Sequence, residues 1–504
     1  MEELKNTDFD QCSFPHPVSD LEILETHISW VVLTGSYAYK IKKPVDLGFL
    51  DFSTLELRKH FCEEELRLNR NWAPQLYIGV VPICEEQGRL LVDGAGTPIE
   101  YAVKMRQFPG DARLDVQLDA GLLRPRDFHA LAQTIANNHA AAAIMKFDGA
   151  KPAIDAISTP MRENFPVMEG HANPDELKKI RDWSDEQLRE HSETIAARHE
   201  HGFVRECHGD LHLENLVRLE SGIVAFDCVE FSAALRNLDV INDVAFLAMD
   251  LIARSRRDLA YVFLNRYLEC TGDYAGMALY GLYFVYHCMI RAKVAAIRGD
   301  TGEMQHYIDV SLRWIDRKPA KIVAMHGLSG SGKTTLSDRL LPLIPALRVR
   351  SDVERKRLFG LGEAQSSESG VGTGIYTDAA KADVYARTLE IADGLLTAGL
   401  NVIVDASFLR LADRQRVARL AHRHGVEPVW LDTSAPDDEL ARRIVERAAG
   451  RSDVSEADVE VLRMQIESRE PLTPEEKSRS VPIDTTRPVD WQALRRAIVE
   501  KLLS

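Results

Sequence analysis

Short apolar runs of strand type are concentrated near the N-terminus of the chain, and helical spacing follows them. Turn-forming residues bound these early runs, which favours strands rather than helices. Strands are expected over Ile28 to Leu33, Tyr77 to Ile83, Arg89 to Val92 and Ile99 to Arg106. After about Pro109 the apolar spacing becomes helical, with helices expected over Asp127 to Ile144 and Glu176 to His199. The pattern therefore predicts a sheet-rich lobe followed by a helix-rich lobe.

Beyond Lys321 the pattern changes to strands and helices in alternation. The stretch DRKPA, Asp316 to Ala320, separates the two patterns, because Pro319 interrupts the chain after a helical run. Such alternation is typical of βαβ units and of a largely parallel sheet. We therefore predict two domains, residues 1–317 and 318–504. The alternating segments are Ile322 to His326, Thr334 to Leu341, Asn401 to Asp405, Arg414 to His424 and Pro428 to Asp432.

Composition and charge support a soluble, multi-domain protein. The 504 residues carry a net charge of −15, which makes non-specific coating of nucleic acid a poor interpretation. Residues 319–504 hold 27 Lys and Arg against 28 Asp and Glu, so nearly all of the net charge precedes them. The seven cysteines form no C-x-x-C pair, which indicates a reduced, cytoplasmic protein. The acidic N-terminus does not predict a signal peptide, and the uncharged run Tyr274 to Ile290 predicts a buried helix rather than a membrane span.

The segment from Gly327 to Thr334 fits the pattern G-x-x-x-x-G-K-[ST] at every position. An apolar strand is expected before it and a helix after it, as a P-loop requires. In such a loop the backbone N–H groups surround phosphate oxygens, Lys333 reaches the terminal phosphates, and Thr334 binds Mg²⁺. The predicted nucleotide-binding residues are Gly327, Ser329, Gly330, Ser331, Gly332, Lys333, Thr334 and Thr335.

Charged residues that follow the P-loop suggest where a phosphate acceptor and a metal bind. Asp352 follows a short strand-like run, and as a general base it would accept the proton of an attacking hydroxyl; helix capping is the alternative interpretation. Arg355, one turn on, would orient an anionic substrate. Asp405 ends an apolar strand, which suits a Mg²⁺ ligand, although an ordinary strand end is the alternative.

A series of arginines occurs at helical spacing further along the chain. Arg443 and Arg447 share a helix face and would close over the phosphates, whereas Arg442 and Arg451 are expected on a solvated face.

Together these residues resemble the small P-loop kinase family of gluconate kinase, the kinase module of polynucleotide kinase and zeta-type toxins. The resemblance covers about Lys321 to Ser504 and depends on the segments GLSGSGKTT, SDVERKRLFG, NVIVDASF and RRIVERAAGRSDVSEADVEVLRMQ. It implies a parallel sheet with helices on both faces, Asp352 as the acceptor-site carboxylate, and Arg443 and Arg447 as lid arginines. The family's acceptors include sugars, nucleic-acid 5′ ends and nucleotide sugars, so the acceptor stays open.

A second phosphotransfer signature lies in the segment HGDLHLEN, which begins at His208. Asp210 and Asn215 are five residues apart, and Asp227 follows twelve residues after Asn215. In a kinase catalytic loop the Asp accepts the proton of the acceptor hydroxyl, while the Asn and the later Asp bind Mg²⁺. Asp210 is therefore predicted as a base and Asn215 and Asp227 as metal ligands.

This second pattern resembles the aminoglycoside phosphotransferase family, over roughly Val18 to Arg317. The resemblance implies a bilobal fold like that of protein kinases, with a strand lysine paired to a helix glutamate. Lys40 and Lys42 lie on one face of their strand, and Glu64 is the expected partner, with Lys40 slightly preferred. The pair Phe108-Pro109 resembles the hinge that receives adenine.

The chain departs from the expected kinase patterns in three places. Its second metal-ligand Asp is followed by Cys228 rather than by Phe-Gly, which the aminoglycoside phosphotransferase family tolerates but protein kinases do not. Its phosphate-covering loop contains one glycine, Gly35. Its acidic residues do not indicate an aminoglycoside acceptor: Asp239, Asp243 and Asp250 would either attract a cationic acceptor or lie on a solvated surface, the second being favoured.

The sequence therefore predicts a cytoplasmic enzyme with two kinase sites, which use ATP and Mg²⁺ to phosphorylate hydroxyls of small molecules. One site acting as a regulatory, pseudokinase-like module is the first alternative. The second alternative is a C-terminal site that acts on a nucleic-acid 5′-hydroxyl or on a nucleotide sugar. It is ranked lower, because a 5′-end kinase should have stacking aromatics and candidates are few: Phe359, Tyr376 and Phe408. No membrane is expected as a partner, and the oligomeric state is left open.

Overall fold

The computed structural model describes residues 9, 12–48, 50–146, 149–362, 365, 375, 377–450 and 459–503. Contacts group the chain into two compact units, each made of two segments. The first unit is Met1–Pro160 with Ser192–Asp250, and the second is Met161–His191 with Leu251–Ser504. The predicted boundary between residues 317 and 318 lies within the second unit and stays a prediction.

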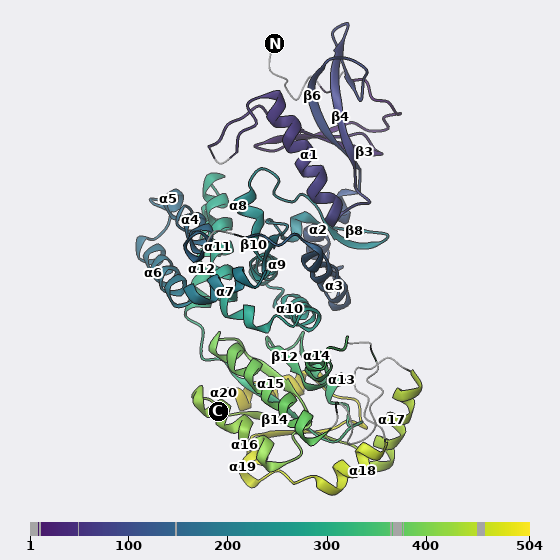
Figure 1. Ribbon diagram of the computed structural model, residues 1–504, viewed down its shortest axis with the longest axis vertical. Coiled ribbons are helices and arrows are strands. Elements are labelled where there is room, and N and C mark those ends of the chain that lie inside the picture. The colour runs from purple at the N-terminus through teal and green to yellow at the C-terminus, as the bar shows by residue number, and fades with distance from the viewer. Residues whose placement is uncertain are drawn as a thin grey trace. The chain divides into compact units, whose positions relative to one another are not determined.

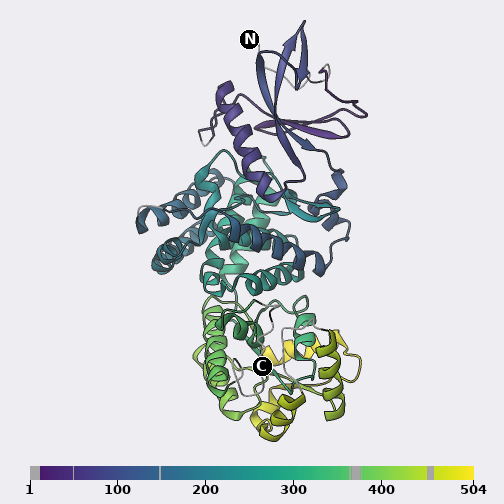
Figure 2. The same ribbon diagram turned by 45° about the vertical axis from the view of Figure 1, so that its right-hand side comes forward.

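The first unit contains a six-stranded antiparallel sheet in the order β1-β2-β3-β6-β4-β5. Helix α1, Leu55–Trp72, packs against β4 and β6, as Figures 1 and 2 show. It begins at Thr54, whose side chain accepts the N–H of Leu57 and so caps the helix. The strands are β1 Glu22–Glu25, β2 Ser29–Leu33, β3 Tyr37–Lys42, β4 Tyr77–Glu86, β5 Arg89–Val92 and β6 Pro98–Arg106.

The rest of the first unit is mainly helical and holds two short strand pairs. Strand β7 pairs with β10, and β8 pairs with β9. The segment that follows β7 carries the second phosphotransfer signature. The elements are α2 Leu114–Asp119, α3 Pro125–Ala141, α4 Ala150–Arg162, α7 Ser192–Glu200, β7 Val204–Glu206, β8 Leu216–Leu219, β9 Gly222–Ala225, α8 Ala233–Arg236, β10 Asn237–Asp239 and α9 Val240–Ala253, with short 3-10 turns η2 Gly110–Ala112 and η3 Leu213–Asn215.

The second unit joins a group of helices to a five-stranded parallel sheet of order β12-β13-β11-β14-β15. The helices that precede the sheet are α5 Phe165–Met168, α6 Pro174–Glu190, α10 Arg257–Thr271, α11 Tyr280–Ile297 and α12 Thr301–Ile315, with η4 Tyr274–Leu279. The strands are β11 Ile322–His326, β12 Leu347–Arg350, β13 Val402–Asp405, β14 Val429–Ser434 and β15 Ser480–Asp484. The helices around it are α13 Lys333–Leu340, α14 Ser351–Leu358, α15 Asp378–Thr397, α16 Leu411–Arg423, α17 Asp437–Gly450, α18 Val459–Ser468, α19 Pro474–Ser478 and α20 Trp491–Leu503.

The predicted fold class is confirmed by this arrangement, with an antiparallel sheet and helices in one region and a P-loop parallel sheet in the other. The helix expected over Glu176 to His199 is interrupted at His191, between α6 and α7. The uncharged run from Tyr274 forms η4 and the first part of α11, most of whose side chains are buried. All seven cysteines are free of disulfide bonds. Among the described residues, no helix is both long and apolar enough to cross a membrane.

Candidate active sites

The P-loop connects β11 to α13, and its glycines allow the backbone to turn closely. Gly330 has φ +79°, and a Cβ there would lie 2.7 Å from the carbonyl oxygen of Leu440. A Cβ on Gly327, at φ +145°, would lie 2.4 Å from the hydroxyl of Thr433. Both contacts are too short for a side chain, so the loop needs glycine at these positions.

Lys333 is the first residue of α13, at the end of this loop. Its ammonium donates to the carbonyl oxygens of Gly327, at 3.0 Å, and Leu328, at 2.7 Å. Burial lowers the pKa of Lys333 to about 8, although Asp405 and Asp352 act in the opposite direction. Within the described part of the chain, no carboxylate forms a hydrogen bond or ion pair with this ammonium. A buried cation held only by carbonyls suits an anionic ligand such as a polyphosphate.

The P-loop borders a cleft of about 1250 Å³. Two predicted residues do not line it: Gly327 and Ser331, whose hydroxyl is 2.7 Å from that of Thr433. Gln465, from α18, accepts the N–H of Ser329 at 2.8 Å and lines the cleft too. The predicted residues that the cleft brings together are Ser329, Gly330, Gly332, Lys333, Thr334, Thr335, Asp352, Arg355, Asp405, Arg443 and Arg447.

On α17, Arg443 contacts the P-loop directly. Its guanidinium donates to the carbonyl of Gly330, at 3.4 Å, and to the hydroxyl of Thr485, at 2.9 Å. Arg442 pairs with Glu439 and Glu446, as expected for a solvated helix face. Arg451 lies outside the described residues.

Helix α14 carries the predicted acceptor residues at its start. Asp352 lies in the first turn, and its carboxylate is 3.8 Å from the guanidinium of Arg355. The residue at the N-cap position is Arg350, so helix capping does not explain Asp352. Asp352 and Arg355 both face the cleft, which is the place an acceptor must enter to reach the phosphates.

Asp405 ends β13, beside the P-loop strand. Burial raises the pKa of its carboxyl, while Arg348 and Arg350 oppose that shift. The hydroxyl of Ser337 is 2.7 Å from one carboxylate oxygen of Asp405. Asp405 and Thr334 both line the cleft and supply the oxygen ligands that Mg²⁺ prefers, so the residues present fit Mg-ATP.

The second phosphotransfer signature forms a compact group in the first unit. The Asn215 amide donates to the Asp210 carboxylate at 2.8 Å and to its carbonyl at 3.0 Å. Asp227 adopts φ +64°, an uncommon conformation for a residue other than glycine, and its carboxylate pairs with Lys40. The Asp227 and Asp210 side chains are about 40% exposed, so both are open to a ligand.

The predicted lysine partner, Glu64, is wrong, because both lysines pair with Glu65. The ammonium groups of Lys40 and Lys42 lie 3.0 and 2.8 Å from the Glu65 carboxylate. Successive residues on a helix differ by about 100° in direction, so Glu65 points into the protein while Glu64 points away. Glu64 instead pairs with Arg67 at 2.9 Å. Burial lowers the pKa of Lys40, but Asp227 and Glu65 outweigh it and raise this pKa well above its usual value.

Three acidic residues are buried structural groups, so both predicted interpretations of them are wrong. Asp239, Asp243 and Asp250 are 4%, 1% and 1% exposed, so they form neither a solvated surface nor an attraction for a cationic acceptor. Asp243 accepts the backbone N–H groups of His208 and Gly209, and Asp250 accepts that of Leu213. Both therefore hold the loop that carries Asp210. Their position in a largely apolar helix, INDVAFLAMDL, was the signal available in the sequence.

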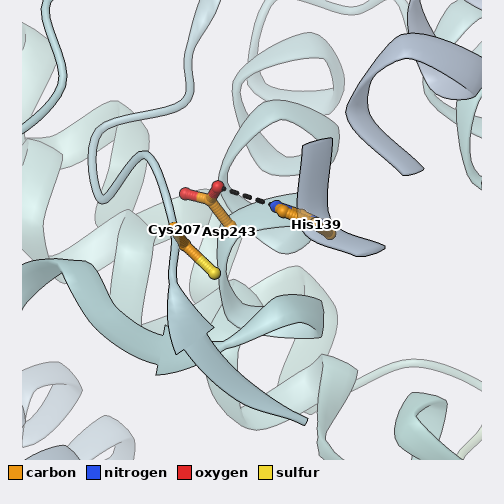
Figure 3. Close-up of side chains that lie close together, drawn as sticks. All are labelled: His139, Cys207 and Asp243. Atoms are coloured by element: carbon orange, nitrogen blue, oxygen red, sulfur yellow. Dashed lines mark hydrogen bonds and ion pairs between the residues drawn. The ribbon is translucent and has the colours of Figure 1, made fainter. Parts of the chain in front are cut away.

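Figure 3 shows Asp243 beside His139 and Cys207. The ligand atoms of these buried residues lie within 4.8 Å of one another, which is close enough for a metal ion. The His139 ring is 3.1 Å from Asp243, whose oxygens also accept the two loop N–H groups. Burial and nearby Asp243 raise the pKa of the Cys207 thiol well above its usual value. Cys207 donates to the carbonyl of Leu238 at 3.5 Å. Through Asp243, this cluster supports the loop that carries Asp210.

The loop around Gly35 is tied to a side chain rather than open. Gln107 accepts the N–H groups of Thr34, at 3.0 Å, and Gly35, at 2.8 Å. Phe108, the predicted hinge residue, packs edge-on against Phe226 with ring centroids 5.2 Å apart. Two donors that could cover a phosphate are thus already used by Gln107.

The aromatics considered for nucleic-acid stacking do not form a platform. Phe408 is 1% exposed and packs against Tyr385 and Trp430. Phe359 is 42% exposed, and Tyr376 lies outside the described residues. A buried ring cannot stack on a base, so Phe408 gives no support to a nucleic-acid acceptor.

Comparison with known proteins identifies relatives of the whole chain. A family model described as "AAA domain" matches residues 322–472, which include the P-loop. The uncharacterized proteins Rv2004c of Mycobacterium tuberculosis (strain ATCC 25618 / H37Rv) and Mb2027c of Mycobacterium bovis (strain ATCC BAA-935 / AF2122/97) are each 31% identical over 453 residues. The match covers 87% of this chain and 89% of each relative. The chain belongs to their family.

Solved structures of kinases match each region at low scores. A choline/ethanolamine kinase family protein from Mesorhizobium loti is 12% identical, covers 60% of this chain and 90% of its own, and has a TM-score of 0.38. A gluconokinase from Sinorhizobium meliloti 1021 is 21% identical, and the match covers 37% of this chain and 91% of the gluconokinase, with a TM-score of 0.25. At these scores we draw nothing about activity from them.

Proposed function

We propose that this protein is an ATP-dependent phosphotransferase with two active sites, one in residues 1–317 and one in residues 318–504. Each site transfers the γ-phosphoryl group of Mg-ATP to a hydroxyl of a small molecule. Transfer of this kind needs positioning and neutralisation of phosphate charge more than covalent catalysis. The proposal places the enzyme in the cytoplasm.

In the P-loop site, Lys333 and the loop N–H groups bind the phosphates, and Thr334 and Asp405 hold Mg²⁺. Asp352 accepts the proton of the acceptor hydroxyl, and Arg355 orients an anionic acceptor. Arg443 braces the loop at Gly330, and Arg447 lies over the phosphates from the same helix. The cleft contains all of these side chains, which supports their common purpose.

In the other site, Asp210 is the base and Asn215 and Asp227 hold Mg²⁺. Lys40, paired with Glu65, contacts the phosphates, and Lys42 supports the pair from the protein interior. The contacts between Asn215 and Asp210, and between Lys40 and Asp227, support these roles.

The observation that carries the proposal is the partly buried ammonium of Lys333, whose hydrogen bonds to described residues go to the loop carbonyls of Gly327 and Leu328, in the cleft that Thr334 and Asp405 also line. A metabolite extract incubated with ATP and wild-type, Asp210→Ala or Lys333→Ala protein tests it by mass spectrometry. We expect metabolites that gain one phosphoryl group and depend on one site or the other. No gain with wild-type protein and no Mg-ATP binding would refute the proposal.

A second candidate is a single enzyme regulated by its N-terminal region. The contacts of Gln107 with Thr34 and Gly35 favour it, because they use donors that a phosphate would need. Nucleotide stoichiometry separates the two functions. Binding of two Mg-ATP molecules per chain supports two active sites. Binding of a single Mg-ATP, which the Lys333→Ala substitution abolishes, supports the regulated enzyme.

A further inference from the structure

Within the second unit, helix α10 packs against β12, and the turn η4 packs against α15. Arg357 of α14 donates to the backbone carbonyl of Glu269 in α10. In the sequence, α10 belongs to the first predicted domain, whereas β12 and α14 belong to the P-loop domain. Strand β12 is at the edge of the parallel sheet. The side-chain amide of Asn265 donates to the carbonyl of Ala346 and accepts the N–H of Arg348, as a neighbouring strand would. Tyr274 donates to the Arg348 carbonyl, so α10 and η4 hold this edge of the sheet.

A chain of buried polar groups runs from α10 to Asp405. The Arg348 guanidinium donates to the Glu269 carboxylate at 2.6 Å and to the Ser337 hydroxyl at 2.9 Å. Ser337 is 2.7 Å from the Asp405 carboxylate and 3.0 Å from the Thr334 carbonyl, so its single hydrogen is better placed for Asp405. Glu269, Arg348 and Ser337 are 5%, 3% and 0% exposed, so water does not compete for these contacts.

Glu269 balances two arginines that would otherwise both face Asp405. Arg348 and Arg350 are two residues apart on β12 and so project to the same face. Glu269 lies 2.6 Å from the first and 3.9 Å from the second. Although burial acts against it, these arginines lower the pKa of Glu269, which keeps it ionised. The two arginines also interact with Asp405, where they oppose the rise in pKa that burial causes.

We propose that Glu269 is a positioning residue for the metal ligand of the P-loop site. By holding Arg348, Glu269 makes the guanidinium reach Asp405 through Ser337 rather than by a direct ion pair. One carboxylate oxygen of Asp405 then accepts the Ser337 hydroxyl, and the other is left for Mg²⁺. This inference rests on the proposed function of Thr334 and Asp405. It means that a helix from the first predicted domain completes the active site of the second.

Loss of the Glu269 charge should weaken metal binding in two ways. Arg348 keeps its ion pair with Asp338 but loses the one with Glu269. Its guanidinium can then turn toward Asp405 and compete with the metal, and Ser337 loses the donor that orients it. Residues that orient metal ligands commonly change metal affinity by about 10- to 100-fold when they are replaced.

Binding of Mn²⁺ to the full-length protein tests this inference, with free Mn²⁺ measured by electron paramagnetic resonance beside a non-hydrolysable ATP analogue. Every variant carries Asp227→Asn to remove a metal ligand of the N-terminal site. We expect Glu269→Gln and Ser337→Ala each to raise the Mn²⁺ Kd by about tenfold. The double variant should be no weaker than the worse single variant, because both changes interrupt one path. Glu354→Gln is the matched control: it neutralises a buried glutamate on α14 whose partners are Arg357 and Arg387.

The positioning role would be overturned if the Mn²⁺ Kd were unchanged in Ser337→Ala or in folded Glu269→Gln. It would also be overturned if Glu354→Gln raised the Kd by the same factor. Additive effects in the double variant would also overturn it, since they indicate separate paths. If Glu269→Gln does not fold, Ser337→Ala alone decides. Asp405→Asn identifies a different failure. If it leaves Mn²⁺ binding unchanged, Asp405 is not a ligand and the proposed P-loop function itself fails.

Discussion

The lysines of the two candidate sites differ in the groups that they contact. In the N-terminal site, Lys40 and Lys42 share Glu65, and each has a second carboxylate, Asp227 or Glu230. In the P-loop site, the acceptors that Lys333 finds among the described residues are two carbonyl oxygens. The pKa of Lys40 is therefore raised, and that of Lys333 is lowered to about 8.

This difference concerns the charge balance of each site in the unliganded protein. The N-terminal site is balanced by its own carboxylates, so a nucleotide must join an existing network of charges. The P-loop site carries an uncompensated cation, so a polyphosphate supplies the missing anion. The first arrangement favours a rigid site, and the second makes ligand binding itself the source of charge balance.

Asp210→Asn offers the largest expected effect. Removing a general base typically costs 10²- to 10⁴-fold in rate, so we expect phosphorylation of the N-terminal site's metabolites to fall by about that factor. Asn keeps the shape of Asp and can still contact Asn215, so nucleotide binding should persist. Mass spectrometry of the metabolite products measures the rate. The comparison of two independent sites breaks down if products of the P-loop site fall equally.

Lys333→Ala is expected to reduce P-loop activity by roughly 10²- to 10³-fold, the usual cost of removing one stabilising donor from a transition state. Titration with Mg-ATP should also lose one binding event per chain. Products that depend on Asp210 serve as the internal control and should keep their rate. Unchanged ATP binding in this variant would contradict the proposal that Lys333 binds the phosphates of ATP.

Residues within motifs were predictable from the sequence, whereas partners supplied by the tertiary fold were not. The P-loop and the Asp210 to Asn215 spacing are local patterns whose chemistry dictates residue type at fixed positions. Glu65 was missed by one residue because EEE at 63–65 gives no phase for the helix face.

The residues that support Asp405 could not be predicted from a local sequence pattern. Arg348 and Glu269 are 79 residues apart in sequence, and their pairing depends on how α10 meets β12. The buried role of Asp243 likewise depends on the loop that folds over its helix, although the apolar neighbours of Asp243 hinted at burial.

Glu65→Gln tests the balanced network of the N-terminal site, with Glu64→Gln as its neighbour on the same helix. Breaking a buried ion pair by removing one partner usually costs about 3–5 kcal/mol, because a charge is left uncompensated. Glu64 pairs with Arg67 and Arg236, whose side chains are 46% and 10% exposed. Because Glu64 is itself partly exposed, its loss should cost less than the loss of the fully buried Glu65. Urea unfolding followed by circular dichroism measures both. Equal costs would restore Glu64 as the partner of the lysines.

The smallest expected effect is a change of Mg-ATP affinity with pH, which should be larger at the P-loop site than at the N-terminal site. Lys333 must be protonated to bind phosphate, so with a pKa of about 8 its affinity for Mg-ATP should fall about tenfold from pH 7 to pH 9. Lys40 stays protonated over this range because its pKa is raised, so the N-terminal site should change little. Calorimetric titration at each pH measures both sites.

The unliganded protein should show the opposite sign at Lys333. Its folded pKa lies below the usual 10.5, so the unfolded state binds more protons between about pH 8 and 10.5 and the contribution of Lys333 to stability rises there. Lys333→Arg is the matched control, because a guanidinium remains charged throughout and should remove the decline in affinity. A P-loop affinity that is equal at pH 7 and pH 9 in wild-type protein would mean that Lys333 is balanced much as Lys40 is, and the contrast between the sites would disappear.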